Sequence, residues 1–173
     1  MRYLLDKNIV RYAIAGLRFG HLRTLSLLEI GALSLWRFAE ARGIPLFISD
    51  SSYHILQRLE PYDEVQLFLA ATEVLTPSRY HVRWSRRIRQ TTGLAPEDAA
   101  MIALATFGTD HNGHILGTEL LVTYDRPMIT GYQTHITTLS RRLRAMTAQL
   151  PLPFSHALLP HLSTPDTLLT TSF

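Results

Sequence analysis

Three aspartates occupy positions from which their carboxylates could share one site. Asp6 follows a short apolar run, Asp98 lies in the first turn of a predicted helix, and Asp125 ends a strand-like segment. Grouped carboxylates repel one another and need a compensating cation. Oxygen-only ligands select the hard ions Mg²⁺ or Mn²⁺, which can activate water to hydrolyse a phosphodiester bond. Taken singly, each aspartate is also explained by helix capping or turn formation.

Strands and helices alternate along the chain in an order that would bring these acids together. The predicted strands cover residues 2–5, 44–49, 72–77 and 119–125. The predicted helices cover residues 8–17, 26–42, 51–59, 62–71, 78–92, 95–107 and 134–150. This alternation predicts an α/β fold with a mainly parallel sheet of about four strands flanked by helices. Ligands of such sheets gather beyond the carboxyl ends of the strands, so the three aspartates should meet at that edge.

Three segments resemble, in the same order, the opening, central and closing sequence motifs of PIN-domain nucleases. They are MRYLLDKNIV at the start, GLAPEDAAMIALA in the centre and LLVTYDRPM near residue 125. The first pairs a strand-end Asp with an Asn two positions on, and the last ends on Thr-x-Asp. The resemblance covers residues 1–150 and implies a PIN-like three-layer fold. It also implies a metal-dependent nuclease that acts on RNA, like the small VapC-type toxins that are paired with an antitoxin.

The resemblance assigns a role to five residues. Asp6, Asp98 and Asp125 would be the catalytic residues and would bind Mg²⁺ or Mn²⁺. Asn8 and Thr123 would orient those carboxylates through hydrogen bonds from an amide or a hydroxyl. Two of these positions have simpler explanations as well, since Asn8 suits a helix start and Thr123 suits a strand.

One acid of the family pattern has no counterpart in this chain. The family places a Glu five or six residues after the Ser that ends the second strand, and here that position carries His54 or Ile55. Asp50 could reach the same edge from the start of its helix, and His54 could bind a metal ion as neutral imidazole. Alternatively the site is incomplete, its activity is weak or lost, and His54 is structural. Two further histidines, His111 and His114, flank a loop glycine without a third ligand.

Arginines dominate the basic residues. The chain has 17 basic and 14 acidic residues, a net charge of +3, and Lys7 as its only lysine. On the helix predicted over 78–92, four arginines share one broad face and are candidates for binding nucleic acid: Arg79, Arg83, Arg86 and Arg87. A solvated helix surface is the alternative interpretation. The last predicted helix carries a weaker second patch: Arg141, Arg142 and Arg144.

The amino-acid composition excludes several other classes of protein and of functional site. The absence of cysteine excludes disulfides, zinc fingers and thiol catalysis. No apolar run reaches the roughly 18 residues of a membrane span, and the early Asp6 argues against a signal peptide, so we expect a cytoplasmic protein. Residues 151–173 contain four prolines and many apolar side chains, and we expect this C-terminal extension to dock on the domain or on a partner.

The sequence therefore predicts a Mg²⁺- or Mn²⁺-dependent ribonuclease. The alternative is a PIN-like module that binds RNA or protein with weak or no catalysis, which the absent Glu favours. A nucleotide-binding domain has no support, because the chain contains neither a P-loop nor a G-x-G-x-x-G motif. Candidate partners are RNA, an antitoxin or another protein, and a second copy of the chain.

Overall fold

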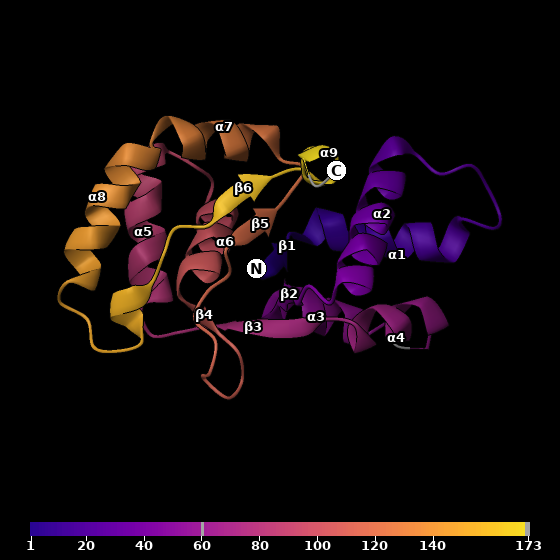
Figure 1. Ribbon diagram of the computed structural model, residues 1–173, viewed down its shortest axis with the longest axis horizontal. Helices are drawn as coiled ribbons and strands as arrows, with labels where there is room; N and C mark the ends of the chain where they lie inside the picture. The colour runs from indigo at the N-terminus through magenta and orange to yellow at the C-terminus, as the bar shows by residue number, and fades with distance from the viewer. Residues whose placement is uncertain (60, 172–173) are drawn as a thin grey trace.

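The fold is built on one central sheet with helices on both faces (Figure 1). The computed structural model describes residues 1–59 and 61–171. In this part of the chain the strand order is β4-β3-β2-β1-β5-β6, and every neighbouring pair is parallel except β3 and β4. The strands are β1 (Tyr3–Leu5), β2 (Leu46–Ser49), β3 (Glu73–Pro77), β4 (Gly108–Thr109), β5 (Leu120–Val122) and β6 (His161–Ser163). The predicted α/β class with a mainly parallel sheet is confirmed.

The two faces of the sheet are covered by different halves of the chain. The helices are α1 (Lys7–Phe19), α2 (Leu27–Arg42), α3 (Asp50–Gln57), α4 (Asp63–Ala70), α5 (His81–Thr92), α6 (Pro96–Phe107), α7 (Arg126–Thr134), α8 (Ile136–Thr147) and α9 (Pro165–Thr171), with a 3₁₀ turn at Phe154–His156. Leu4 packs in a core with α5 to α8, whereas its neighbours Tyr3 and Leu5 pack with α1 to α4. Successive strand residues point to opposite faces, so both faces of β1 are buried.

Helix α7 and the two short outer strands are absent from the sequence-based prediction. One helix was expected over 134–150, but the chain forms α7 and α8 with a break at His135. Asp125 was expected to end the strand over 119–125, but β5 ends at Val122 and Asp125 instead caps α7, whose first turn contains Pro127. The sheet has two strands more than the four expected. β4 has two residues and β6 three, which is too short for an alternating pattern to be visible in the sequence.

The C-terminal extension contributes to the same sheet. β6 pairs in parallel with β5, with Leu121 opposite Leu162. Ala157 and Leu162 are buried in the core that α5 to α8 form, and α9 then packs against α2. In the described residues, no helix is both long enough and apolar enough to cross a membrane.

Candidate active site

Asp6 lies where β1 ends and α1 begins, with only 7 % of its surface exposed. One carboxylate oxygen accepts the backbone N–H of Lys7 at 2.7 Å. The other accepts the hydroxyl of Thr123 at 2.9 Å. Burial raises the pKa of Asp6, the hydrogen bonds from Thr123 and Lys7 oppose that rise, and the charge of Asp125 adds to it. Asp6 therefore caps a helix and also faces a second carboxylate.

Thr123 joins the ends of two neighbouring strands. Its side chain is fully buried just beyond β5, and its hydroxyl both donates to Asp6 and accepts the backbone N–H of Asp125 at 3.0 Å. A single hydroxyl thus fixes the Asp6 carboxylate relative to the backbone that carries Asp125. This geometry is the hydrogen-bonding arrangement that the sequence motif implied for Thr123.

Asp125 and Asp98 complete the group of acids at the carboxyl edge of the sheet. Asp125 caps α7, since its carboxylate accepts the backbone N–H of Met128 at 2.8 Å. Asp98 lies in the first turn of α6 and is partly buried. Burial is the largest cause of its raised pKa, followed by the charges of Asp125, Asp6 and Glu97. Asp6 and Asp125 therefore lie close enough to Asp98 for their charges to raise its pKa, and the charge of Asp125 acts on Asp6 as well.

The acids converge without enclosing an ion position. Among the described residues, no three His, Asp or Glu side chains are already grouped as metal ligands. The donor chemistry nevertheless fits a hard divalent ion, because all three side chains are oxygen donors. Burial, and to a smaller extent the neighbouring carboxylates, raises the pKa values of Asp6 and Asp98.

Two charged residues beside the acids were not singled out from the sequence. Lys7 follows Asp6, Glu97 precedes Asp98, and the Lys7 ammonium forms an ion pair with the Glu97 carboxylate. The pair raises the pKa of Lys7, to which the charges of Asp6 and Asp98 also contribute, and lowers that of Glu97. The signal for both residues was their adjacency to predicted site residues, but the contact itself joins positions 90 residues apart.

The residues expected to replace the missing Glu form a pair of their own. Asp50 begins α3 directly after β2, and its carboxylate lies 3.4 Å from Nε2 of His54. The His54 side chain is 63 % exposed and also contacts the Gln57 amide at 3.2 Å. The charges that shift the pKa of Asp6 are those of Lys7 and Asp125. The structure therefore does not bring His54 or Asp50 into the group formed by Asp6, Asp98 and Asp125.

Asn8 and the loop histidines take no part in this group. Within the described residues, the half-buried Asn8 side chain makes no hydrogen bond, so its expected contact with an acid is not formed. His111 and His114 are exposed on the loop after β4. That loop is held instead by Asp110, which accepts the backbone N–H groups of His114 at 2.7 Å and Ile115 at 3.1 Å.

The predicted nucleic-acid-binding arginines occupy the start and the middle of α5. Arg79 precedes the helix and packs its guanidinium over the rings of Tyr80 and Phe154. The chain turns at residues 93–95 into α6, so the other end of α5 lies beside Asp98. Arg83 is exposed in the first turn of α5, at the same end as Arg79. Arg86 is exposed and Arg87 half-buried in the middle of the helix, and in the described part of the chain none of the four forms an ion pair.

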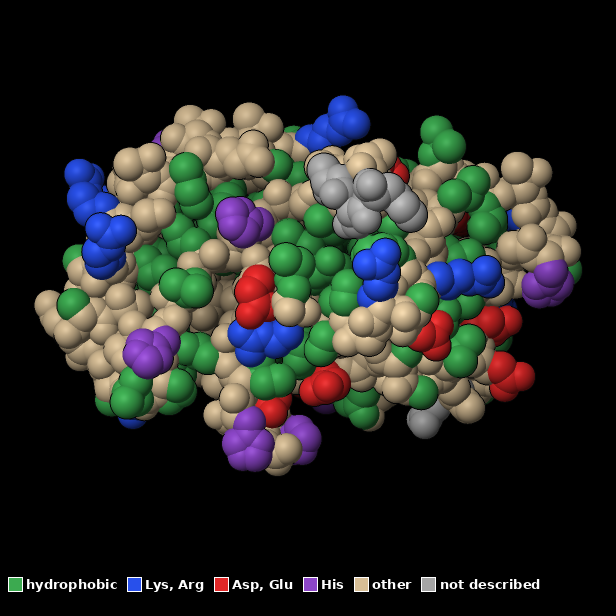
Figure 2. Space-filling view, viewed as in Figure 1, with side chains coloured by type: hydrophobic (Ala, Val, Ile, Leu, Met, Phe, Trp, Pro, Cys, Tyr) green, Lys and Arg blue, Asp and Glu red, His purple; other side chains and the backbone are tan. Residues whose placement is uncertain are grey.

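Helix α8 extends the basic surface of α5. The two helices pack together, and the Arg142 guanidinium donates to the Thr91 hydroxyl at 2.7 Å near the end of α5. Arg141 and Arg144 are exposed on the same helix. In Figure 2, cationic side chains stand over α8 at the left of the molecule, with no acidic side chain near them on this face.

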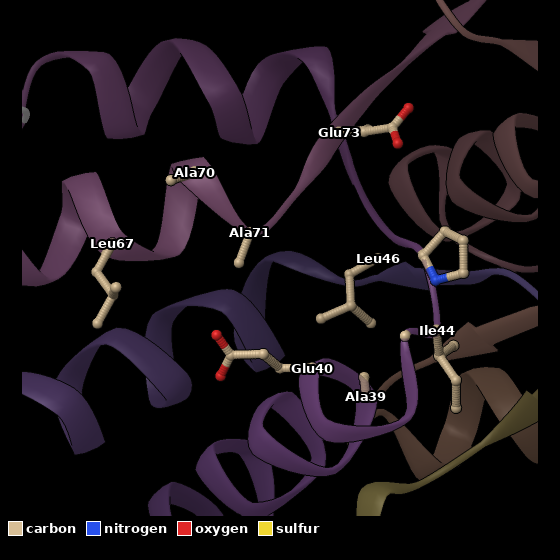
Figure 3. A pocket seen from close by; sticks show the side chains of 10 residues that line it. Ala39, Glu40, Ile44, Leu46, Leu67, Ala70, Ala71 and Glu73 are labelled. Carbon is tan, nitrogen blue, oxygen red and sulfur yellow. The ribbon is translucent and has the colours of Figure 1, made fainter.

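A separate cleft of about 410 Å³ lies at the opposite, amino edge of the sheet. It is formed by the end of α2, the end of α4 and the residues that lead into β2 and β3. Figure 3 shows Glu40 and Glu73 pointing in different directions there, while small apolar side chains such as Ala70 face the cavity. Without convergent polar groups, this cleft lacks the features of an active site.

Comparison with known proteins supports the fold. No protein-family model matches the sequence, and no curated protein matches it. The structure is similar to a chain in the crystal structure of VapBC2 from Rickettsia felis bound to a DNA fragment from their promoter, with a TM-score of 0.52 and 15 % sequence identity. The match covers 95 % of this chain and 98 % of the other chain. At this level of identity the similarity concerns the three-layer arrangement and not the site residues.

Proposed function

We propose that this protein is a metal-dependent ribonuclease whose site is formed by Asp6, Asp98 and Asp125. The observation that carries the proposal is the Thr123 hydroxyl, which ties Asp6 to the backbone of Asp125 at the carboxyl edge of the sheet. To cap α1, the Asp6 carboxylate needs only the hydrogen bond from the Lys7 N–H. The hydrogen bond from the buried Thr123 hydroxyl is additional to capping and fixes Asp6 relative to Asp125. Asp98 completes the group, because the charges of Asp125 and Asp6 add to the effect of burial in raising its pKa.

Asp6, Asp98 and Asp125 would hold Mg²⁺ or Mn²⁺. Such an ion lowers the pKa of a bound water and stabilises negative charge that develops on a phosphate. The chain's own residues supply orientation: Thr123 holds one oxygen of Asp6, and the Met128 N–H holds one oxygen of Asp125. Each of these carboxylates keeps further lone pairs for an ion, since a carboxylate accepts about four contacts.

The basic surface of α5 and α8 supports RNA as the substrate. A polyanion is repelled by bare carboxylates, so a nuclease needs cations beside its acids. Arg83, Arg86 and Arg87 on α5 and the arginines of α8 lie on the half of the molecule that packs around α6, whose first turn carries Asp98. Arg79 is occupied by aromatic rings at the far end of α5, and we expect it to contribute less to binding.

The fold comparison favours a toxin-like role with a protein partner. The similar chain comes from a VapBC complex, and the motifs at residues 6, 98 and 125 resemble those of VapC-type nucleases. We propose an antitoxin-like protein as a partner on this basis. The DNA in that crystal structure was bound by the VapBC2 complex, and a DNA-binding role for the present chain has no separate support.

The direct test is Asp98→Asn, which keeps the size of the side chain and removes its charge. We expect the wild-type protein to cleave single-stranded RNA with Mg²⁺ or Mn²⁺ and the variant to lose at least about 100-fold in rate. Asp63→Asn is the matched control, because Asp63 is an exposed aspartate in the first turn of α4. Equal activity of wild type and Asp98→Asn would reject the site.

Metal binding provides a second test that does not need a substrate. A ligand that binds only the folded state at 100 times its Kd stabilises that state by about 2.7 kcal/mol. For a domain of this size, the melting temperature should rise by about 5–10 °C with saturating Mn²⁺. Asp98→Asn should lose this shift and Asp63→Asn should keep it.

The second candidate function is an RNA- or protein-binding module without turnover. It is favoured by the absence, in residues 1–59 and 61–171, of a preformed group of three metal ligands, and by the separate Asp50–His54 pair on the β2 side. Wild-type protein that binds RNA, shows no melting shift with Mn²⁺ and cleaves nothing would establish this alternative.

A further inference from the structure

Tyr124 lies between Thr123 and Asp125 in the short segment that joins β5 to α7. Its side chain is half-buried against the core that α1 to α4 form. The phenol hydroxyl donates to the backbone oxygen of Leu28, in the first turn of α2, at 2.9 Å. The ring packs edge-on against that of Tyr12 in α1, with 5.8 Å between the ring centroids. One side chain thus attaches the segment of residues 123–125 to α1 and α2.

Helix α2 provides the space for this contact at Gly31. The residue is buried within α2, where glycine is a poorer helix former than alanine. A Cβ at this position would lie 2.5 Å from the Tyr124 hydroxyl oxygen and 2.8 Å from Oδ1 of Asp166 in α9. Both distances are well below van der Waals contact, so an alanine would displace the phenol. The close approach of Tyr124 therefore explains a glycine that α2 itself does not favour.

The C-terminal extension holds the same segment from a second side. The backbone N–H of Thr123 donates to the backbone oxygen of Ser163, the last residue of β6, at 3.0 Å. Helix α9 then packs against α2, as Figure 1 shows, and brings Asp166 next to Gly31. The segment is therefore fixed through its backbone by β6 and through the Tyr124 side chain by α2.

We infer that Tyr124 is a positioning residue of the proposed site, which fixes the segment carrying Thr123 and Asp125 by anchoring it to α2. The inference rests on the proposed function and deepens it. The Thr123 hydroxyl donates to Asp6 and accepts the N–H of Asp125, so a displacement of the segment changes both contacts at once. Tyr124 acts through its two neighbours in the chain and is assigned no contact with the substrate.

The first test is Tyr124→Phe, which removes only the phenol hydroxyl. Tyr132→Phe is the matched control, because the Tyr132 hydroxyl also donates to a backbone oxygen, that of Pro160, at 2.7 Å. Tyr132 lies about two turns of α7 beyond Asp125. The readout is amide hydrogen exchange of the full chain without metal or RNA. We expect the Asp125 N–H to exchange about 3- to 10-fold faster in Tyr124→Phe and within about twofold of wild type in Tyr132→Phe.

The amide of Leu4 separates positioning from a general loss of stability. Leu4 is fully buried in the centre of β1, so its exchange reports on opening of the whole domain. The inference requires that Tyr124→Phe accelerate exchange at Asp125 more than at Leu4. Equal acceleration at the two amides, or equal effects of Tyr124→Phe and Tyr132→Phe at Asp125, would overturn it.

Gly31→Ala tests the same contact from the side of α2, because it keeps the hydroxyl and displaces it. We expect the same local acceleration at Asp125 as in Tyr124→Phe. In the double variant the oxygen that the new Cβ would meet is gone, and the exposed Asp166 side chain can rotate away. Gly31→Ala should therefore add nothing to Tyr124→Phe, whereas independent, additive effects would contradict the inference.

RNA cleavage by the same proteins separates the inference from the proposed function. Tyr124→Phe should lower kcat about 3- to 10-fold with KM unchanged, and Tyr132→Phe should leave both constants unchanged. If the wild type cleaves no RNA while exchange at Asp125 responds as expected, the proposed function fails and the anchoring role of Tyr124 stands. If Asp98→Asn abolishes cleavage while Tyr124→Phe matches Tyr132→Phe in exchange or in kcat, the inference fails and the site stands.

Discussion

Removal of the Thr123 hydroxyl tests the contact on which the site depends. Thr123→Val keeps the branched shape of a fully buried side chain and replaces the hydroxyl by a methyl group. The change costs a hydrogen bond to the Asp6 carboxylate and leaves the backbone N–H of Asp125 without its partner. A bond to a charged group contributes about 1.5–3 kcal/mol, a neutral one about 0.5–1.5 kcal/mol, and the added methyl group returns about 0.8 kcal/mol.

The expected loss of folding free energy for Thr123→Val is therefore about 2–3 kcal/mol, or about 5–10 °C in melting temperature. Thr118→Val is the matched control at the other end of β5. Thr118 is also buried, but its hydroxyl donates at 3.3 Å to a neutral backbone oxygen, that of Leu120. We expect the control to lose about 1 kcal/mol.

The same variant should change the titration of Asp6. The Thr123 hydroxyl stabilises the ionised carboxylate and so lowers the pKa of Asp6, against the larger effect of burial. Without the hydroxyl, the pKa of Asp6 should move further above its ordinary value, which a carboxyl ¹³C NMR titration would detect. A loss of stability no greater than that of Thr118→Val, together with an unchanged Asp6 titration, would refute the proposed link between the two strands.

Three further predictions concern other parts of the molecule. Asp6 and Asp98 have raised pKa values in the folded metal-free protein, so their ionisation should destabilise it. The melting temperature should fall as the pH rises from the pKa of an unfolded aspartate, near 4, through the higher pKa values of the folded protein. Asp98→Asn should reduce that fall. Gly117→Ala should cost about 3 kcal/mol by chemical denaturation, since its φ is +59° and a Cβ would lie 2.4 Å from a carbonyl oxygen of α6. Replacing Arg83 and Arg87 by Ala should weaken RNA binding and reduce the slope of log K against log salt by about 1 per lost phosphate contact, with little change in melting temperature.

The central part of the fold could be predicted because burial leaves a clear pattern there. β1, β2 and β5 are covered on both faces, so each is an uninterrupted apolar run that is easy to recognise. Their parallel order then places the residues that follow them at one edge. The positions of Asp6 and Asp125 follow from this rule, whereas β6 depends on three residues that gain their strand conformation only by pairing with β5.

The charged contacts of the site were beyond sequence reasoning for a different reason. Neither Lys7 nor Glu97 belongs to a pattern with a period, and their contact depends on where α6 begins relative to α1 in space. His54 illustrates the reverse case. Its spacing from Ser49 made it a candidate ligand, but α3 turns its side chain towards solvent, Asp50 and Gln57. Spacing along the chain does not determine which face of a short helix meets the site.

The strand order explains why the acids gather on one side of β1. β1 lies between β2 and β5, and the Thr123 hydroxyl connects the ends of β1 and β5 only. On the β2 side, the Ser49 hydroxyl caps α3 and contacts Ser52. Among the described residues, no side-chain hydrogen bond links the end of β2 to Asp6.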